Sequence, residues 1–221
     1  MVNLFAHRGF WHEYNQQNTI ASLKNARESA FDGIECDLFF HESRGLLLSH
    51  DEVKDKDLSN FAQYLQYENF FKYWLDFKNL DLVNARKVFE IVKSEVMKAK
   101  INFNNIFIAP FISDYQLARA ILKIAREVFE EKLNFAAMCK CAEEEDGLVE
   151  FIHEENIKFL SIAHELINEK LIEKLKDVEL FVWTINDLER IIYLEKFGIK
   201  NFITDKITPQ IYARYIDKPR T

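Results

Sequence analysis

Glycine, proline and cysteine are all scarce in this chain. Its 221 residues include only 5 Gly and 3 Pro, which argues against long Gly-rich loops and for short, tight connections between regular elements. The cysteines, Cys36, Cys139 and Cys141, are odd in number, so no disulfide framework is expected and a reducing compartment fits. Two closely spaced thiols without a second pair are poor evidence for zinc, and we expect Cys139 and Cys141 to be small core residues.

Long apolar runs and an excess of basic charge are missing too. No run approaches the ~18 residues of a membrane span, and Met1 leads directly into the strand-like segment 2–6 without a basic leader. We therefore expect a cytoplasmic protein with no stable membrane insertion. The 29 basic residues are outnumbered by 36 acidic ones, a net charge of −7, which gives no nonspecific hold on nucleic acid or an anionic membrane.

Apolar and aromatic residues, by contrast, are plentiful. Hydrophobic residues make up 48% of the chain and aromatic residues 14%, with 20 Phe. This content excludes intrinsic disorder and suffices for a large continuous core. Because a domain typically has ~150 residues and no composition break suggests a linker, we expect residues 1–221 to form one domain.

Short β-rich runs alternate with longer stretches of helical spacing. Eight runs are predicted strands, at residues 3–7, 33–38, 73–77, 105–109, 134–138, 158–162, 179–184 and 201–204. A ninth run, 46–49, follows the turn at 43–45 and is predicted to be the return arm of a hairpin. Helices are predicted at 20–31, 83–98, 114–132, 166–176 and 187–197, with N-caps at Asp114, Asn168 and Asn186. Because parallel strands need helical crossovers, the pattern predicts an α/β fold, a compact (β/α)8 TIM barrel with a hairpin extension after its second strand.

Polar side chains gather where the predicted strands end. The ends of the first strand, the second strand, the hairpin arm and the third strand carry His7, Glu35, Asp37, His50, Asp76 and Lys78. Barrel active sites lie at the C-terminal ends of the strands, and the strand period of two puts each closely spaced pair on one face. We expect these side chains to converge at one mouth of the barrel.

Such a cluster favours metal-assisted chemistry at phosphorus. Three carboxylates at close range raise one another's pKa, and a hard divalent cation removes that penalty. All-oxygen ligation favours Mg²⁺ or Ca²⁺ over zinc. Two histidines beside the ion could act as base and acid, while Lys78 would supply a point charge and Arg8 a bidentate fork for phosphoryl oxygens.

Four motifs, in order, resemble the signature of the glycerophosphodiester phosphodiesterase family. They are Ala6-His7-Arg8-Gly9, Gln17-Asn18-Thr19, Gly33-Ile34-Glu35-Cys36-Asp37 and Ser49-His50-Asp51. Three later segments resemble that family's later barrel strands: Leu75-Asp76-Phe77-Lys78, Val182-Trp183-Thr184-Ile185-Asn186 and Phe202-Ile203-Thr204-Asp205. The resemblance therefore covers nearly the whole chain.

The resemblance implies a metal-dependent phosphodiesterase of the superfamily that also contains bacterial phosphatidylinositol phospholipases and spider-venom phospholipases. It implies that His7 and His50 are the catalytic acid/base pair; our working hypothesis within that pair is His50 as base and His7 as acid, and the reverse stays open. It also implies that one divalent cation, magnesium or calcium, is held by Glu35, Asp37 and Asp76.

Four further positions match residues that bind substrate in that family: Arg8, Asn18, Lys78 and Trp183. Arg8 and Lys78 correspond to phosphate-binding positions, and Trp183 to an aromatic that lines the pocket. For Asn18, ordering the loop before the first helix is an equal alternative.

The chain departs from the family pattern at three points. Gln17 stands where the family usually has Glu, which removes a charge beside the site, and Asp76 stands where the third ligand is commonly Glu. Only about two dozen residues separate Asp51 from Asp76, so an insertion that usually covers the glycerol end of the substrate is missing. The alcohol groups of the substrate therefore stay open, a glycan-linked phosphodiester being one alternative.

The predicted function is hydrolysis of a small phosphodiester, first of all a glycerophosphodiester of lipid metabolism, to an alcohol and a phosphomonoester. One alternative is a phospholipase-type intramolecular phosphotransfer that gives a cyclic phosphate. Another is a noncatalytic barrel that binds a phosphorylated ligand. The sequence gives no oligomeric state.

Other polar and aromatic residues have plainer interpretations. We expect surface or loop roles for His12, His41, His153 and His164, and a solvated helix start for the acidic run 143–146. Asp51 is expected to orient its neighbours and Asp205 to cap the last loop. For four further residues, lining the pocket mouth and plain packing are equal alternatives: Phe10, Trp11, Phe111 and Met138.

Overall fold

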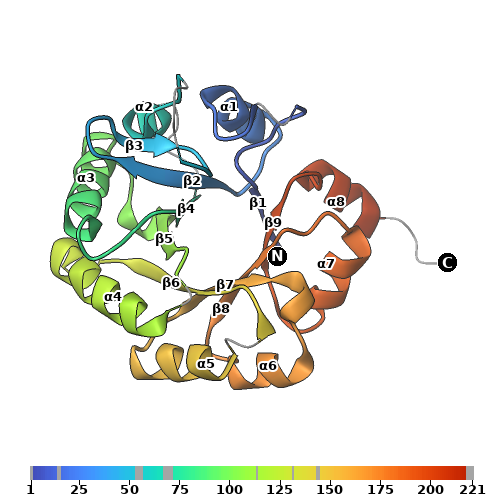
Figure 1. Ribbon diagram of the computed structural model, residues 1–221. Coiled ribbons are helices and arrows are strands. Elements are labelled where there is room, and N and C mark those ends of the chain that lie inside the picture. The colour runs from blue at the N-terminus through green and yellow to red at the C-terminus, as the bar shows by residue number, and fades with distance from the viewer. Residues whose placement is uncertain are drawn as a thin grey trace.

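The predicted (β/α)8 barrel is confirmed. A computed structural model describes residues 2–13, 16–52, 57–66, 72–112, 114–130, 132–142 and 145–217. In this part of the chain one sheet has nine strands in the order β1-β9-β8-β7-β6-β5-β4-β2-β3, and an additional β1–β2 pairing closes it. Eight parallel strands thus form a ring, and the helices surround it (Figure 1).

All nine predicted strands are present. They are β1 Asn3–Ala6, β2 Gly33–His41, β3 Gly45–Leu48, β4 Lys72–Phe77, β5 Ile106–Pro110, β6 Asn134–Cys139, β7 Phe159–Ala163, β8 Glu179–Trp183 and β9 Asn201–Thr204. The hairpin is also confirmed, because β3 pairs antiparallel with the last residues of β2, from Leu38 to His41. β2 therefore continues beyond the ring, and β3 lies outside it.

The helices follow the strands. They are α1 Ile20–Glu28, α2 Phe61–Gln66, α3 Ala85–Lys98, α4 Tyr115–Phe129, α5 Glu145–Glu154, α6 Glu169–Lys174, α7 Leu188–Glu195 and α8 Pro209–Ile216. The ranges of α2, α5 and α8 were not predicted. Of the acidic run at 143–146, residues 143 and 144 lie outside the described residues. None of the described helices is long and apolar enough to cross a membrane.

Helix ends differ from the predicted ones for local reasons. α1 ends at Glu28 rather than at residue 31 because Ala30 has a φ of 59°, and α4 ends before Glu130, whose φ is 55°. Left-handed backbone of this kind cannot continue a right-handed helix. Asp114 and Asn168 are confirmed as N-caps. Asn186 is not one, because the Asp187 side chain accepts the cap hydrogen bond from the Glu189 N–H.

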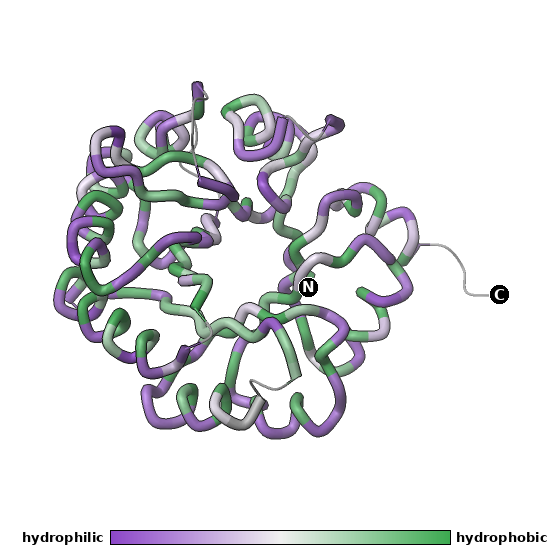
Figure 2. The backbone as a smooth tube through the Cα atoms, in the orientation of Figure 1, coloured by the Kyte–Doolittle hydropathy of each residue, from purple (hydrophilic) through white to green (hydrophobic). Residues whose placement is uncertain are grey.

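Two hydrophobic layers follow from the strand period of two. The larger one lies between the ring and the helices and receives alternate strand residues such as Ile34, Cys36 and Leu75. The helices carry both hydrophobic and hydrophilic residues (Figure 2), as expected of helices with one buried face. Cys139 is buried in this layer, as predicted, and Cys36 is buried there too. The prediction is wrong for Cys141, which is only half-buried.

The smaller layer fills the inside of the barrel with aromatic rings. The Trp74 ring stacks on the Phe181 ring at 4.1 Å, and Phe107 lies 5.0 Å from Phe181. Phe5 meets the same Phe181 ring edge-on at 5.3 Å. The interior is therefore a packed, apolar floor beneath the ends of the strands rather than a channel.

Gly33 makes room for this floor. A Cβ at this position of β2 would lie 2.3 Å from Phe5 Cε1 and 2.8 Å from the Lys72 carbonyl oxygen. Neither distance is compatible with the packing of a barrel interior. Because Gly33 has no side chain, the Phe5 ring can fill the space beside it. Gly33 lies two residues before Glu35, so both positions are on the same face of β2.

We expect Gly33→Ala to lower the free energy of unfolding by about 1–3 kcal/mol, because the added methyl group overpacks the barrel interior. Urea unfolding followed by circular dichroism measures the change. The double variant Gly33→Ala/Phe5→Leu should recover part of the loss, since the shorter side chain leaves space. An unfolding midpoint for Gly33→Ala equal to that of the wild type would contradict this account.

Candidate active site

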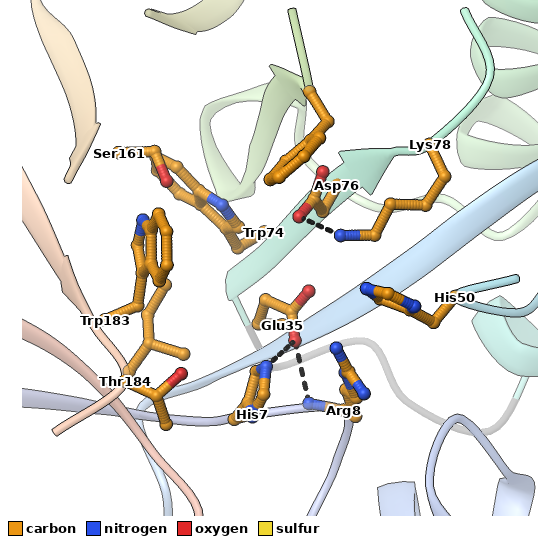
Figure 3. Close-up of a pocket in the computed structure, with 12 residues that line it drawn as sticks. His7, Arg8, Glu35, His50, Trp74, Asp76, Lys78, Ser161, Trp183 and Thr184 are labelled. Carbon is orange, nitrogen blue, oxygen red and sulfur yellow. Dashed lines mark hydrogen bonds and ion pairs between the residues drawn. The ribbon is translucent and has the colours of Figure 1, made fainter. Parts of the chain in front are cut away.

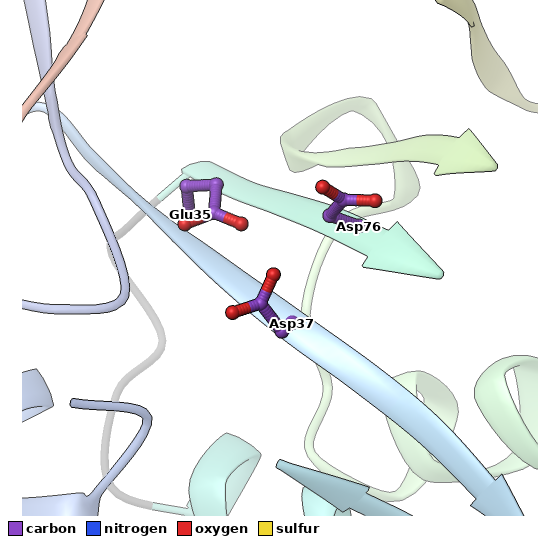
Figure 4. Close-up of side chains that lie close together, drawn as sticks. All are labelled: Glu35, Asp37 and Asp76. Atoms are coloured by element: carbon purple, nitrogen blue, oxygen red, sulfur yellow. The ribbon is translucent and has the colours of Figure 1, made fainter. Parts of the chain in front are cut away.

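Three buried carboxylates stand side by side at the end of the barrel. Glu35 and Asp37 point inward from β2, and Asp76 lies on the neighbouring strand β4, directly opposite Asp37 in the register (Figure 4). One oxygen of each lies within 4.8 Å of the others. Their exposed fractions are 3%, 0% and 9%. The predicted convergence of these residues is therefore observed, at the point where β2 leaves the ring.

Two cationic side chains neutralise part of this charge. Lys78 Nζ lies 2.8 Å from Asp37 Oδ1 and 2.7 Å from Asp76 Oδ2. Arg8 Nε lies 2.9 Å from Asp37 Oδ2. When all three carboxylates are ionised, two cations leave net negative charge in a site closed off from most solvent, which favours a further cation.

Asn18 is bound to Asp37 through both ends of its amide. Its Nδ2 donates to Asp37 Oδ2 at 2.8 Å, and its Oδ1 accepts the Asp37 backbone N–H at 3.0 Å. The side chain is buried and does not line the cavity described below. Asn18 thus fastens the loop before α1 to β2, in line with the loop-ordering alternative, and its amide also orients the Asp37 carboxylate.

The loop between β1 and α1 carries both Arg8 and Asn18 in left-handed backbone, with φ of 56° and 54°. This turn aims the Arg8 backbone N–H at Glu35 Oε2, 2.8 Å away.

Gly9, with a φ of 81°, lets the loop lie against α1, since a Cβ there would be 2.3 Å from Ser22 Oγ. Gln17 Oε1 accepts from Arg8 Nη1 at 2.9 Å and so fixes the guanidinium. A left-handed backbone costs free energy at residues other than Gly. The contacts that Arg8 and Asn18 make with the carboxylates offset this cost.

The electrostatic environment gives the three carboxylates different pKa values. Burial and the charge of Asp37 raise the pKa of Glu35 to about 7, and burial raises that of Asp76 to about 6 against the opposing charge of Lys78. Burial also opposes ionisation of Asp37, but the charges of Lys78 and Arg8 outweigh it and lower the pKa of Asp37. The same carboxylates outweigh burial at Lys78 and raise the pKa of its ammonium.

His7, directly after β1, is held by a residue from the far end of the chain. Its Nδ1 forms a hydrogen bond of 2.7 Å with Asp205 Oδ1, and its Nε2 lies 3.9 Å from Glu35 Oε2. Burial lowers the pKa of His7, but the hydrogen bond to Asp205 and the charge of Glu35 outweigh burial and raise it. The predicted role of Asp205 as a cap for the last loop misses this contact.

Asn186 completes the arrangement around Asp205. It donates from Nδ2 to Asp205 Oδ2 at 2.9 Å, and its Oδ1 accepts the Asp205 backbone N–H at 2.9 Å. This is why Asn186 does not cap α7. The carboxylate of Asp205 is thereby turned toward His7.

His50 approaches the site from outside the ring. It follows β3, its side chain is 44% exposed, and its Nδ1 lies 2.8 Å from Asp51 Oδ1. Asp51 thus contacts His50, as expected of a residue that orients its neighbour. The two histidines reach the same cavity from two separate loops (Figure 3).

A cavity of about 180 Å³ lies above the aromatic floor, and two kinds of residue line it. The charged and titratable residues are His7, Arg8, Glu35, His50, Asp76 and Lys78. The aromatic, aliphatic and hydroxyl residues are Trp74, Phe111, Ser161, Trp183, Thr184 and Ile203. Trp183 lines the cavity as predicted, and its Nε1 is buried with no hydrogen-bond partner among the described residues.

Some cavity residues were not found by sequence reasoning. Trp74 stands two residues before Asp76 on β4, so the strand period could have placed it on the same inward face. Ser161 carried no such signal, since a lone serine within a hydrophobic run is unremarkable. Phe111 lines the cavity, whereas Phe10, Trp11 and Met138 do not.

The four other histidines lie outside the cavity lining. His12 and His153 are exposed, and His41 and His164 are half-buried. These positions agree with surface or loop roles.

The carboxylates suit a divalent cation. Asp37 Oδ1 and Asp76 Oδ1 are both buried and, among the described residues, have no hydrogen bond of good geometry. A buried carboxylate oxygen without such a bond is costly unless a positive charge satisfies it. Three oxygen donors from two strands match the preference of Mg²⁺ and Ca²⁺ for carboxylates.

The sequence matches no protein-family model, and no curated protein matches it significantly. The fold, however, is that of solved glycerophosphodiester phosphodiesterases. The enzyme from Parabacteroides distasonis superimposes with a TM-score of 0.75 at 18% identity, covering 97% of this chain and 96% of that one. The enzyme from Thermotoga maritima gives a TM-score of 0.72 at 19% identity and covers 99% of each chain. A phosphodiesterase from Oleispira antarctica, solved with the product sn-glycerol-3-phosphate, gives 0.73 at 14% identity and covers 98% of this chain and 97% of that one.

Replacing Asn18 tests its contact with Asp37. We expect Asn18→Leu to lower the free energy of unfolding by about 1–3 kcal/mol, because it leaves the buried Asp37 N–H and Oδ2 short of partners. Thermal unfolding by calorimetry measures the loss. Thr19→Ser, at the adjacent N-cap of α1, keeps a hydroxyl cap and serves as the control. Equal losses in the two variants would show that the Asn18 amide contributes nothing specific.

Proposed function

We propose that this chain, which has the fold of the glycerophosphodiester phosphodiesterases, is a metal-dependent phosphoric diester hydrolase. Its substrate is a glycerophosphodiester or a related small phosphodiester of lipid metabolism, and its products are an alcohol and a phosphomonoester. The observation that carries the proposal is one cavity lined by two carboxylates of the buried cluster of three, by two histidines and by the cationic side chains of Arg8 and Lys78. No other described cavity has such a set.

Glu35, Asp37 and Asp76 would hold one divalent cation, Mg²⁺ or Ca²⁺. When bound, this ion would polarise the phosphoryl group and offset the charge that develops on its oxygens. The carboxylates stand above a dry aromatic floor, which strengthens every charge interaction inside the cavity.

The two histidines suit different proton-transfer roles. His7 is held at Nδ1 by Asp205, so its Nε2 is the atom left to donate a proton to the leaving alkoxide. His50 is more exposed and is oriented by Asp51, which suits a base that takes a proton from an incoming water. The roles correspond to His7 as acid and His50 as base.

The lining of the cavity suits the two parts of a phosphodiester. The charges of Arg8 and Lys78 can bind phosphoryl oxygens. Trp183 offers an apolar face and an indole N–H that has no hydrogen-bond partner among the described residues, which together fit a hydroxylated alcohol. The glycerol-3-phosphate bound by the Oleispira antarctica phosphodiesterase supports a glycerol-type alcohol here.

We further propose that residues 1–221 form one domain and that the protein works in the cytoplasm. The closure of the barrel by β1 and β9, near opposite ends of the chain, supports a single domain. The odd number of cysteines, three in all, supports a reducing compartment.

A metal-titrated activity assay tests the function. We expect glycerophosphodiesters to be hydrolysed with Mg²⁺ or Ca²⁺, and chelation to abolish turnover. Asp37→Asn should lower turnover at least 100-fold, because it removes the charge of a ligand, while Glu42→Gln, which removes an exposed charge, should leave turnover unchanged. Phosphorus NMR identifies the product. A persistent cyclic phosphate would establish phosphotransfer instead, and no turnover across a substrate panel would favour a binding protein.

The histidine assignment makes a separate prediction. We expect His7→Ala and His50→Ala each to lower kcat by ~10² to 10⁴, because each removes a proton-transfer group from the rate-limiting step. A substrate with a p-nitrophenolate leaving group, which needs little protonation, should largely rescue His7→Ala but not His50→Ala. His153→Ala, exposed at the end of α5, is the control. Unchanged turnover in both single variants would overturn the assignment.

A further inference from the structure

The oxygens of Asp37 are not equally available to a cation. Oδ2 lies 2.8 Å from Asn18 Nδ2 and 2.9 Å from Arg8 Nε, so two donors already approach it. Oδ1 is the oxygen left for a metal ion, and it is the one that Lys78 Nζ contacts at 2.8 Å. A divalent cation bound by Asp37 therefore meets the Lys78 ammonium at a single atom.

The contact between Lys78 and Asp37 Oδ1 is an ion pair without a hydrogen bond of good geometry. The directed hydrogen bond of Lys78 goes instead to Asp76 Oδ2, at 2.7 Å. Among the described residues Asp76 Oδ1 has no hydrogen-bond partner, so this oxygen is available to a metal ion. Asp37 is thus the ligand for which the two positive charges compete most directly.

Lys78 borders the open space of the cavity while it contacts the carboxylates. In this one conformation its ammonium also lies 4.5 Å from the centre of the Phe111 ring, which lines the same cavity. A cation near an aromatic face is stabilised by it. Because Lys78 directly follows β4 and its long side chain faces the cavity, a rotation of that side chain would carry the charge from the carboxylates into the space where a phosphate would bind.

We propose that Lys78 is a displaceable counter-ion of the three carboxylates, held at Asp37 Oδ1 until a divalent cation binds and releases its ammonium into the cavity. The inference rests on the metal site of the proposed function. It makes the phosphate-binding position of Lys78 depend on the metal, so metal and phosphate bind cooperatively through one side chain. In the metal-free protein Lys78 stabilises the buried carboxylates.

NMR of the wild-type protein with ¹³Cε-labelled lysine tests the displacement directly. In the metal-free protein we expect nuclear Overhauser contacts between the Lys78 ε-methylene and the β-methylenes of Asp37 and Asp76. Saturation with Mg²⁺ should remove them, while the signal of Lys140, 4.3 Å from the same Phe111 ring, should stay unchanged. Contacts that persist with Mg²⁺ bound would overturn the inference and leave the proposed function standing.

Calorimetric titration with Mg²⁺ and Ca²⁺ gives the second measurement. Lys78→Met lacks the ammonium that competes with the ion, so it should bind the ion at least about tenfold more tightly than the wild type does. Metal should also raise the unfolding temperature of Lys78→Met by more than it raises that of the wild type. Lys140→Met is the matched control for removing one positive charge near the ring. Lys78→Gln replaces Lys78→Met if the latter does not fold.

The outcomes separate the two ideas. If both Lys78 variants bind metal no more tightly than the wild type, the proposed competition is wrong, although the metal site remains. An increase in metal affinity for Lys140→Met as large as that for Lys78→Met would also overturn it. The increase would then come from the loss of any nearby positive charge rather than from the loss of a direct competitor. Absence of binding in every variant, Lys78→Met included, would overturn the metal site and with it the proposed function.

Discussion

The burial of three carboxylates on two adjacent strands is the constraint that the rest of the site serves. Such charges cannot stay ionised in a low dielectric without partners. Lys78 and Arg8 bring positive charge to them, and Asn18 donates a hydrogen bond. The left-handed backbone of Arg8 and Asn18 is the local strain that these contacts offset.

The aromatic interior of the barrel makes this constraint more severe. The packed aromatic rings of Phe5, Trp74, Phe107 and Phe181 close the space below the carboxylates and shield them from solvent on that side. The same exclusion of water raises the pKa of Glu35 to about 7 and gives a bound ion or phosphate strong interactions. Gly33 links the two features, because the absence of its side chain allows the Phe5 ring to lie within the interior.

Strand positions were predictable because hydrophobic runs and turns are local features. The period of two along a strand was enough to place Glu35 with Asp37 on one face. Helix ends were less predictable, since residues such as Ala30 adopt left-handed backbone that composition does not reveal. Ser161 was missed for another reason, because only the closed ring shows which strands face the cavity.

The sequence by itself determined the barrel, the order of its strands and the set of charged residues at their ends, because these follow from periodicity and motif order. The tertiary structure decided which atoms meet. His7 and Asp205 are 198 positions apart and form a hydrogen bond only because β1 pairs with β9. The pairing of β2 with β4 likewise brings Asp37 opposite Asp76, with Lys78 between them. Chain closure and strand register, which no local pattern encodes, therefore decide the chemistry of each side chain.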